Sequence, residues 1–267
     1  MSSGAAAAAA AARRRLLVLI GSGPGIGVAT ASLFASKGFS VALLSRNAER
    51  LKEDAAKVCS SAASSDAGGV PIAVETFPVD VSDHAALQKT LEAVHASLGP
   101  PEVVVYNAAR VGPSQFGAFT PEALLDDFKI NGVGLYVAAV WAMPYLAELA
   151  SLQQQQQEEA PRHPSFLLSG SGINYTPIPP LFSLSMQKAA QSNLLNSLGQ
   201  MYGPKGVHVA RLDINGFVRE DDETMAPARC AKQHWRLSQQ QQKDWEHVVD
   251  VGDMDALIEG MKAQGMM

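Results

Sequence analysis

The sequence has little of what marks secreted, membrane-spanning or nucleic-acid-binding proteins. Its only cysteines are Cys59 and Cys230, far apart in a chain of 267 residues. This usage is typical of free thiols in a reducing compartment, so we expect a cytoplasmic protein without a disulfide framework. No apolar run approaches the roughly 20 residues that cross a bilayer, which predicts no membrane association. The net charge of −5 argues against nucleic acid as a partner.

Four segments have low complexity. Poly-alanine fills most of the first 12 residues, and three arginines follow it. A signal peptide carries its positive charge before the apolar stretch, and here the order is reversed. We therefore interpret residues 1–14 as a disordered tail, with a transit peptide as the alternative, and residues 15–267 as one domain. The other patches, at 60–69, 153–159 and 239–242, are predicted to be surface loops.

Short apolar runs alternate with segments of helical periodicity along the rest of the chain. The expected strands are residues 16–20, 40–44, 72–79, 102–106, 165–168, 207–212 and 247–251. The expected helices are residues 26–36, 47–58, 83–97, 121–128, 132–150 and 181–202. This alternation predicts a doubly wound α/β (Rossmann) fold, with a mostly parallel seven-stranded sheet and helices on both faces. A ligand is then expected at the carboxyl ends of the strands.

A glycine-rich turn follows the first expected strand and reads Gly21-Ser22-Gly23-Pro24-Gly25-Ile26-Gly27. It does not fit G-x-G-x-x-G, because Ile26 stands where the third glycine belongs. It fits G-x-x-x-G-x-G, with a tight turn and a helix N-terminus directed at an anion. We predict that Gly21, Gly25, Ile26 and Gly27 bind the pyrophosphate of a dinucleotide.

The end of the second expected strand indicates which dinucleotide is bound. An NAD-binding protein usually has an acidic residue there for the ribose hydroxyls, whereas this chain has Ser45, Arg46 and Asn47. A guanidinium beside a neutral hydroxyl suits a 2′-phosphate, which arginine can bind with two hydrogen bonds. A solvated surface arginine is the alternative. We predict that NADP(H) is preferred over NAD(H).

The glycine spacing and several later motifs resemble the short-chain dehydrogenase/reductase family, in its single-domain branch. Asp80 and Val81 resemble the family's pair beside the adenine ring. Tyr106-Asn107-Ala108-Ala109 resembles Asn-Asn-Ala-Gly, which implies cofactor contacts by Asn107 and Ala108. After the sixth strand the family has Pro-Gly, and here Asn215-Gly216-Phe217-Val218 stands in its place. Backbone groups near Val218 are then expected on the nicotinamide side. A substrate lid is expected at about 217–243.

The resemblance also implies a catalytic set with one member missing. Asn131, Ser171 and Lys188 match the family's asparagine, serine and lysine, but Leu184 stands in the position of the tyrosine. In the family the phenol delivers a proton, and the lysine holds the ribose and lowers the pKa of the phenol. Lys188 lies one helical turn after position 184 and keeps the ribose role. Tyr175 is the candidate for a replacement acid.

These patterns predict an NADP(H)-dependent oxidoreductase acting on a small organic carbonyl, imine or enone. The alternatives are a catalytically impaired NADPH-binding protein and a non-redox isomerase or cyclase on the same scaffold. The six histidines lack metal-ligand spacing, so no metal is expected. The two longest expected helices are more apolar than one buried face requires, which predicts a homodimer or homotetramer.

Overall fold

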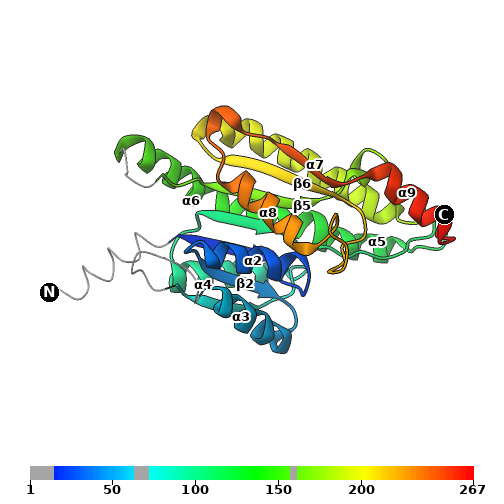
Figure 1. Cartoon of the computed structure of the whole chain (residues 1–267), viewed down its shortest axis with the longest axis horizontal. Coiled ribbons are helices and arrows are strands. Elements are labelled where there is room, and N and C mark those ends of the chain that lie inside the picture. The colour runs from blue at the N-terminus through cyan, green and yellow to red at the C-terminus, as the bar shows by residue number, and fades with distance from the viewer. Residues whose placement is uncertain (1–14, 63–71, 157–160) are drawn as a thin grey trace.

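The computed structural model describes residues 15–62, 72–156 and 161–267, so the predicted tail lies outside the described residues. Its centre is a sheet of seven strands in the order β3-β2-β1-β4-β5-β6-β7 (Figure 1). Every pairing in this sheet is parallel, whereas the sequence predicted a mostly parallel one. The strands are β1 (Leu16–Ile20), β2 (Ser40–Ser45), β3 (Val74–Pro78), β4 (Val103–Tyr106), β5 (Ser165–Gly170), β6 (His208–Asn215) and β7 (Val248–Gly252).

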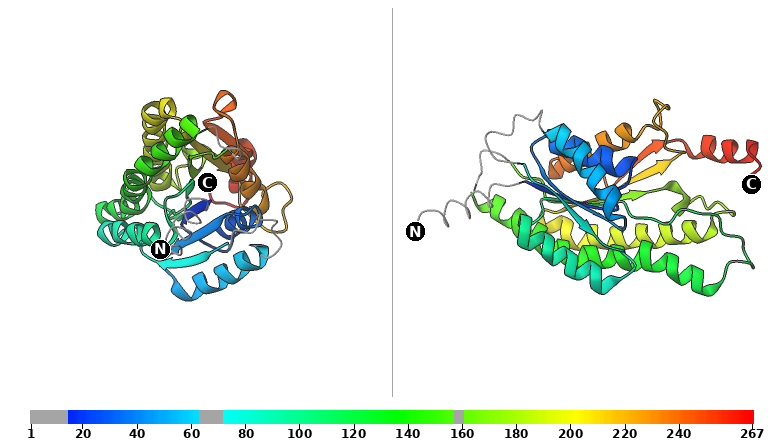
Figure 2. Two further views of the ribbon diagram at one scale, coloured as in Figure 1. Left: turned by 90° about the vertical axis from the view of Figure 1, so that its left-hand side faces the viewer. Right: turned by 90° about the horizontal axis from the view of Figure 1, so that it is seen from below.

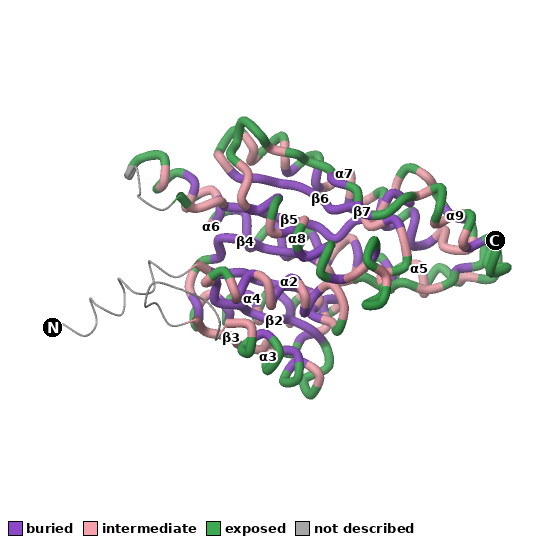
Figure 3. Tube along the Cα trace, viewed as in Figure 1, coloured by how far each residue is buried: buried purple, intermediate pink, exposed green. Residues whose placement is uncertain are grey.

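Helices cover both faces of this sheet, as Figure 2 shows. One face packs against α2 (Ile26–Ser36), α3 (Ala48–Ala62) and α8 (Pro227–Ser238). The other packs against α4 (His84–Leu98), α6 (Gly134–Gln156) and α7 (Phe182–Tyr202). With both faces covered, β1, β2, β4 and β5 are buried along their whole length (Figure 3). This explains why the strands read as continuous apolar runs rather than as alternating ones.

Two further helices lie at the end of the molecule that carries the C-terminus (Figure 1). Helix α5 (Pro121–Phe128) leads through a π-helical turn, Lys129–Val133, into α6. Helix α9 (Met254–Ala263) follows β7 and was not anticipated. Its buried and partly buried residues, Met254, Leu257, Ile258 and Met261, have helical spacing, so the sequence held this signal.

Helix α8 lies within residues 217–243, where a substrate lid was expected. Its inward face is formed by Cys230, Ala231, His234 and Leu237. The spacing is helical, but cysteine, alanine and histidine make a weaker apolar signal than leucine or valine would. Pro227 occupies the first helical position, where proline is favourable. The polar composition of the surrounding segment hid this signal. Within the predicted lid, residues 217–226 and 239–241 lie outside helices and strands, although Val218 and Met225 pack against the core.

The predicted loop at 153–159 is also partly helical, because α6 continues to Gln156. By length and composition alone, the helical run Pro121–Gln155 could cross a membrane, with a window of mean hydropathy 1.4. The expectation that no such stretch exists fails by this measure. Half of that window is buried inside the protein, where Leu135, Ala138 and Leu146 belong to the core beside the sheet.

Candidate functional site

The glycine turn is held against the end of β4. Gly21 has φ of +96°, and a Cβ there would lie 2.3 Å from the backbone nitrogen of Ala108. Asn107 Nδ2 donates to the carbonyl oxygen of Gly21 at 2.9 Å. A Cβ at Gly27 would lie 3.1 Å from that same oxygen. Gly21 and Gly27 are therefore required by close backbone packing, whereas Asn107 orders the turn.

Gly23 and Gly25 face open space instead. A Cβ at Gly23 would meet nothing within 4 Å, and one at Gly25 only Pro227 Cγ at 4.0 Å. Both glycines, with Ile26 and Gly27, line a cavity of about 380 Å³ that extends to the ends of β5 and β6. An open cradle before the first turn of α2 fits the pyrophosphate of a dinucleotide.

A second cavity, of about 360 Å³, lies at the ends of β2 and β3. Asn107 and Ala109 line both cavities, so the two together follow the carboxyl edge of the sheet. Six more residues predicted to contact the cofactor line this second cavity, and Asn47 does not. They are Gly21, Ser45, Arg46, Asp80, Val81 and Ala108. Arg50 and Arg110 also line it, so the cavity has three arginines. This arrangement fits the adenosine half of the cofactor.

Arg50 and Arg110 are the members of this group that the sequence reasoning missed, and Arg50 lies beside Ser45. Arg50 Nη2 donates to Ser45 Oγ at 2.9 Å and to the Ser22 carbonyl at 3.3 Å. Its Nε is buried without a partner among the described residues. Arg46 is 72% exposed and lies 3.9 Å from Asp80. Two guanidiniums therefore flank Ser45, one hydrogen-bonded to it and one largely exposed.

Asn47 and Asp80 both have local structural partners. Asn47 Oδ1 accepts from the backbone nitrogen of Arg50 at 3.0 Å, so Asn47 caps α3 rather than lining the cavity. Asp80 accepts from Ser82 N and Oγ at 2.9 and 2.7 Å. Burial raises the pKa of Asp80, but the Ser82 hydrogen bonds and the Arg46 charge outweigh it and lower the pKa overall. Asp80 is therefore an anion beside the predicted adenine position.

Asn131 lies behind the cavity wall, within the π-helical turn. It is fully buried, and its Nδ2 donates to the Asp127 carbonyl at 3.0 Å. Its own carbonyl accepts from Gln191 Nε2 at 2.8 Å. The following helix must start close to β4, because a Cβ at Gly134 would lie 2.6 Å from Tyr106 Oη. This contact explains the glycine three residues after Asn131, and the Gln191 contact was not foreseen.

Ser171 and Lys188 line the larger cavity together with Leu184. Lys188 is buried, and its Nζ donates to the Ser169 carbonyl at 2.8 Å. Burial lowers the pKa of Lys188 to about 8, against the opposing charge of Asp213. Leu184 is 6% exposed and packs in an apolar cluster with Ile173, Ile178 and Met261. The position that resembles the family's tyrosine is therefore part of an apolar wall of the cavity.

Tyr175 does not join this group. Its side chain is 56% exposed and lies outside the residues that line the cavity. Its hydroxyl donates to Asp250 Oδ1 at 3.4 Å, on β7. Burial, followed by the charges of Asp250 and Asp213, raises the pKa of Tyr175. Val218 also lies outside the lining and packs against the core, whereas Gly216 and Phe217 line the cavity.

The departure from Pro-Gly after β6 accompanies a buried polar network. Arg211 Nε donates to both carboxylate oxygens of Asp213 at 3.0 Å. Asn215 Oδ1 accepts from the Gly172 backbone nitrogen at 2.7 Å, and its Nδ2 donates to Asp250 at 2.8 Å. These contacts fix the loop that carries Ser171.

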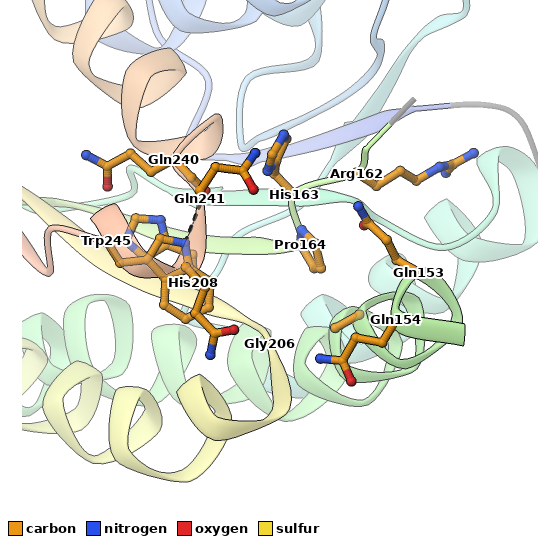
Figure 4. A pocket seen from close by; sticks show the side chains of 12 residues that line it. Gln153, Gln154, Arg162, His163, Pro164, Gly206, His208, Gln240, Gln241 and Trp245 are labelled. Atoms are coloured by element: carbon orange, nitrogen blue, oxygen red, sulfur yellow. Dashed lines mark hydrogen bonds between the residues drawn. The ribbon is translucent and has the colours of Figure 1, made fainter. Parts of the chain in front are cut away.

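A third cavity, of about 230 Å³, lies at the opposite end of the sheet (Figure 4). His208 and Trp245 stack there, with ring centroids 4.9 Å apart. His163 lines the same cavity, at the end of the sheet away from the two cavities along the carboxyl edge. Both His208 ring nitrogens face backbone carbonyls at 3.0 Å, so this histidine serves packing.

The comparisons with known proteins agree with this geometry. Residues 15–157 match the family model described as short chain dehydrogenase. A 2,3-dihydro-2,3-dihydroxybenzoate dehydrogenase of Bacillus subtilis is 28% identical over 133 residues, which are 50% of this chain and 48% of that protein. Oxidoreductase asL5 of Sarocladium schorii is 28% identical over 72% of this chain and 67% of its own. The match therefore spans about half the length of the Bacillus relative.

Solved structures give the same fold. The L-sorbose reductase of Gluconobacter frateurii, complexed with NADPH and L-sorbose, superposes with a TM-score of 0.75 at 17% identity, over 90% of this chain and 97% of that chain. A short chain oxidoreductase of Pseudomonas aeruginosa, described as containing an atypical catalytic center, gives 0.72 at 21% identity over 89% and 95%. With its family match over more than half of its length, the chain belongs to the short-chain dehydrogenase family.

Proposed function

We propose that the protein is an NADP(H)-dependent oxidoreductase that transfers hydride to or from a small organic carbonyl, imine or enone. The observation that carries this proposal is the pair of cavities along the carboxyl edge of the sheet. One has two arginines beside Ser45, and the other ends at Ser171 and Lys188. The bound cofactor would supply the hydride.

The residues of the chain have separate tasks in this proposal. Arg46 and Arg50 bind the 2′-phosphate, and the open backbone at Gly23 and Gly25 admits the pyrophosphate. Ser171 donates a hydrogen bond to the substrate oxygen. The substrate contacts an apolar surface made by Leu184, Phe217, Leu257 and Met261, which favours a substrate with a hydrocarbon portion.

The preference for NADP(H) is supported by the charge at the end of β2. Ser45 has no carboxylate next to it in sequence, and Arg46 and Arg50 add two positive charges. Some similar solved structures carry such a nucleotide, including an archaeal alcohol dehydrogenase from Thermococcus sibiricus complexed with 5-hydroxy-NADP. That likeness concerns the fold, so the preference rests on the arginines.

A binder without catalysis is the second candidate, because Leu184 offers no proton. A non-redox isomerase or cyclase is the third. Both leave the cofactor site intact but predict no consumption of NADPH.

The test is a titration with NADPH and NADH by calorimetry, followed by a screen for NADPH oxidation over ketones, cyclic imines and enones. NADPH should bind more tightly and be oxidised by at least one class. Gly25→Val is the control, because its side chain fills the space open to the pyrophosphate and should abolish binding. Binding without oxidation would favour the binder or the non-redox enzyme. Normal binding by Gly25→Val would refute the assigned cofactor position.

A further inference from the structure

The cavity beside Leu184 contains few polar side chains. Of the described residues that line it, four are polar, and the rest are apolar or glycine. The polar ones are Asn107, Ser169, Ser171 and Lys188. Lysine is the one among them that gains or loses a proton in the ordinary pH range, because serine hydroxyls and amides are poor acids.

Lys188 also has the right place on its helix. It follows Leu184 by four residues, so the two side chains lie on the same face of α7, and both line the cavity. A substrate that contacts Leu184 is therefore within one helical turn of the amine. Tyr175, the earlier candidate for the acid, lies outside this lining and donates to Asp250.

The surroundings of Lys188 leave its charge weakly compensated. Its Nζ donates to one neutral acceptor, the Ser169 carbonyl, and an ammonium has two further N–H groups. No ion pair to Lys188 occurs within the described residues. Asp213, whose charge acts on it, is paired with Arg211 and accepts from Asn174. Burial without a counter-ion makes proton release easier, in line with the lowered pKa of about 8.

The acceptor of Lys188 is itself held in place. Ser169 is the last residue but one of β5, and its Oγ lies 3.5 Å from Nε2 of the buried His234. The other ring nitrogen of His234 lies 3.1 Å from Thr30 Oγ1. Helices α2 and α8 thus fix the strand end against which the amine rests.

From this geometry we infer that Lys188 is the proton donor in reduction and the proton acceptor in oxidation, in place of the phenol that Leu184 cannot provide. The inference rests on the proposed function. As hydride reaches the carbonyl carbon, the C=O π pair moves to oxygen. That oxygen takes a proton from Nζ, so an N–H bond breaks, an O–H bond forms and Lys188 becomes a neutral amine. Water restores the proton, and oxidation runs through the reverse steps.

The decisive variant is Lys188→Arg, with Lys89→Arg on the outer surface of α4 as the matched control. Arginine keeps the positive charge and hydrogen-bond donors but releases no proton at working pH. NADPH affinity should stay within several-fold of the wild type, while turnover of a carbonyl probe should fall by roughly 10²–10⁴-fold. Wild-type turnover should decline as pH rises through about 8, and the residual rate of Lys188→Arg should lack that decline.

A measurement without turnover accompanies the variant. The cofactor-free protein is labelled with ¹³C at lysine Cε, and the Lys188 resonance is identified by its absence in Lys188→Arg. Its titration midpoint should lie near pH 8, below the ordinary lysine value of 10.5.

The outcomes separate the two proposals. If NADPH is oxidised but Lys188→Arg keeps its turnover, or if the amine titrates near pH 10, the inference is overturned and the proposed function stands. If the wild type does not oxidise NADPH with any of the probes, the proposed function is overturned and the inference falls with it.

Discussion

Arg50 Nη2 lies 2.9 Å from Ser45 Oγ, so the first turn of α3 is joined to the end of β2. This contact fixes one guanidinium at the edge of the cavity that fits adenosine, next to the exposed Arg46. A nucleotide with a 2′-phosphate would meet both groups, whereas one with a free hydroxyl there would gain little from either.

We therefore expect Arg46→Ala and Arg50→Ala each to weaken NADPH binding by roughly tenfold or more, because a hydrogen bond to a charged group contributes about 1.5–3 kcal/mol. NADH binding should change little in Arg46→Ala. Fluorescence titration of both nucleotides measures the two effects. Equal wild-type affinities for NADPH and NADH would contradict the assignment of this end of the site.

Leu184→Tyr tests the missing phenol. The new hydroxyl should supply a proton when Lys188 has lost its own, so carbonyl reduction should rise most clearly above pH 8, by about tenfold at pH 9. Leu184→Phe is the matched control for crowding, because it adds the ring without the hydroxyl. Steady-state rates from pH 6 to 10 compare the two variants. Equal rates in both would mean that the reacting oxygen does not approach position 184.

Because His234 is buried, we expect the folded protein to lose stability in acid. Burial lowers the pKa of this histidine to about 4, from 6.5 in a solvated state. Between those values the unfolded chain binds more protons than the folded one, so stability contributed by the neutral ring is lost as pH falls from 6.5 toward 4. The loss should approach about 3 kcal/mol. Urea unfolding at pH 7 and pH 4.5 should show a smaller difference in His234→Gln than in the wild type.

We also propose a homo-oligomer that pairs through the outer faces of α6 and α7. Tyr136 and Val140 lie one turn apart on α6 and are each 56% exposed, and Met186 is exposed on α7. Light scattering at micromolar concentration should give a dimer or tetramer mass. Val140→Glu should lower that mass without unfolding the protein. A monomeric wild type would refute the proposal.

The sequence predicted the central strands β1, β2, β4 and β5 well because each is covered on both faces and keeps a largely apolar run. It also predicted the glycine turn, because close contacts leave no room for a side chain at Gly21 and Gly27. Helix α8 was not predicted, because its buried face is formed by Cys230, Ala231 and His234, which give a weak apolar pattern. Local composition says nothing about what packs against such a face.

The site was harder to predict, because its contacts join distant segments. Arg50 lies near Arg46 in sequence, but its role depends on the distance to Ser45 across the end of a strand. The Gln191 contact to Asn131 spans 60 residues. Tyr175 follows Ser171 closely along the chain, but the fold turns it toward Asp250. Spacing identified the candidates, and only the fold determined which of them meet.

Helix α9 has a practical consequence for work with the protein. Leu257 and Met261 line the larger cavity, a few residues before the last residue of the sequence. A purification tag placed directly after α9 would lie near that cavity, where it can compete with ligands or displace the helix. Arg15 precedes β1 at the opposite edge of the sheet, so a tag at the N-terminal side is the safer choice for binding measurements.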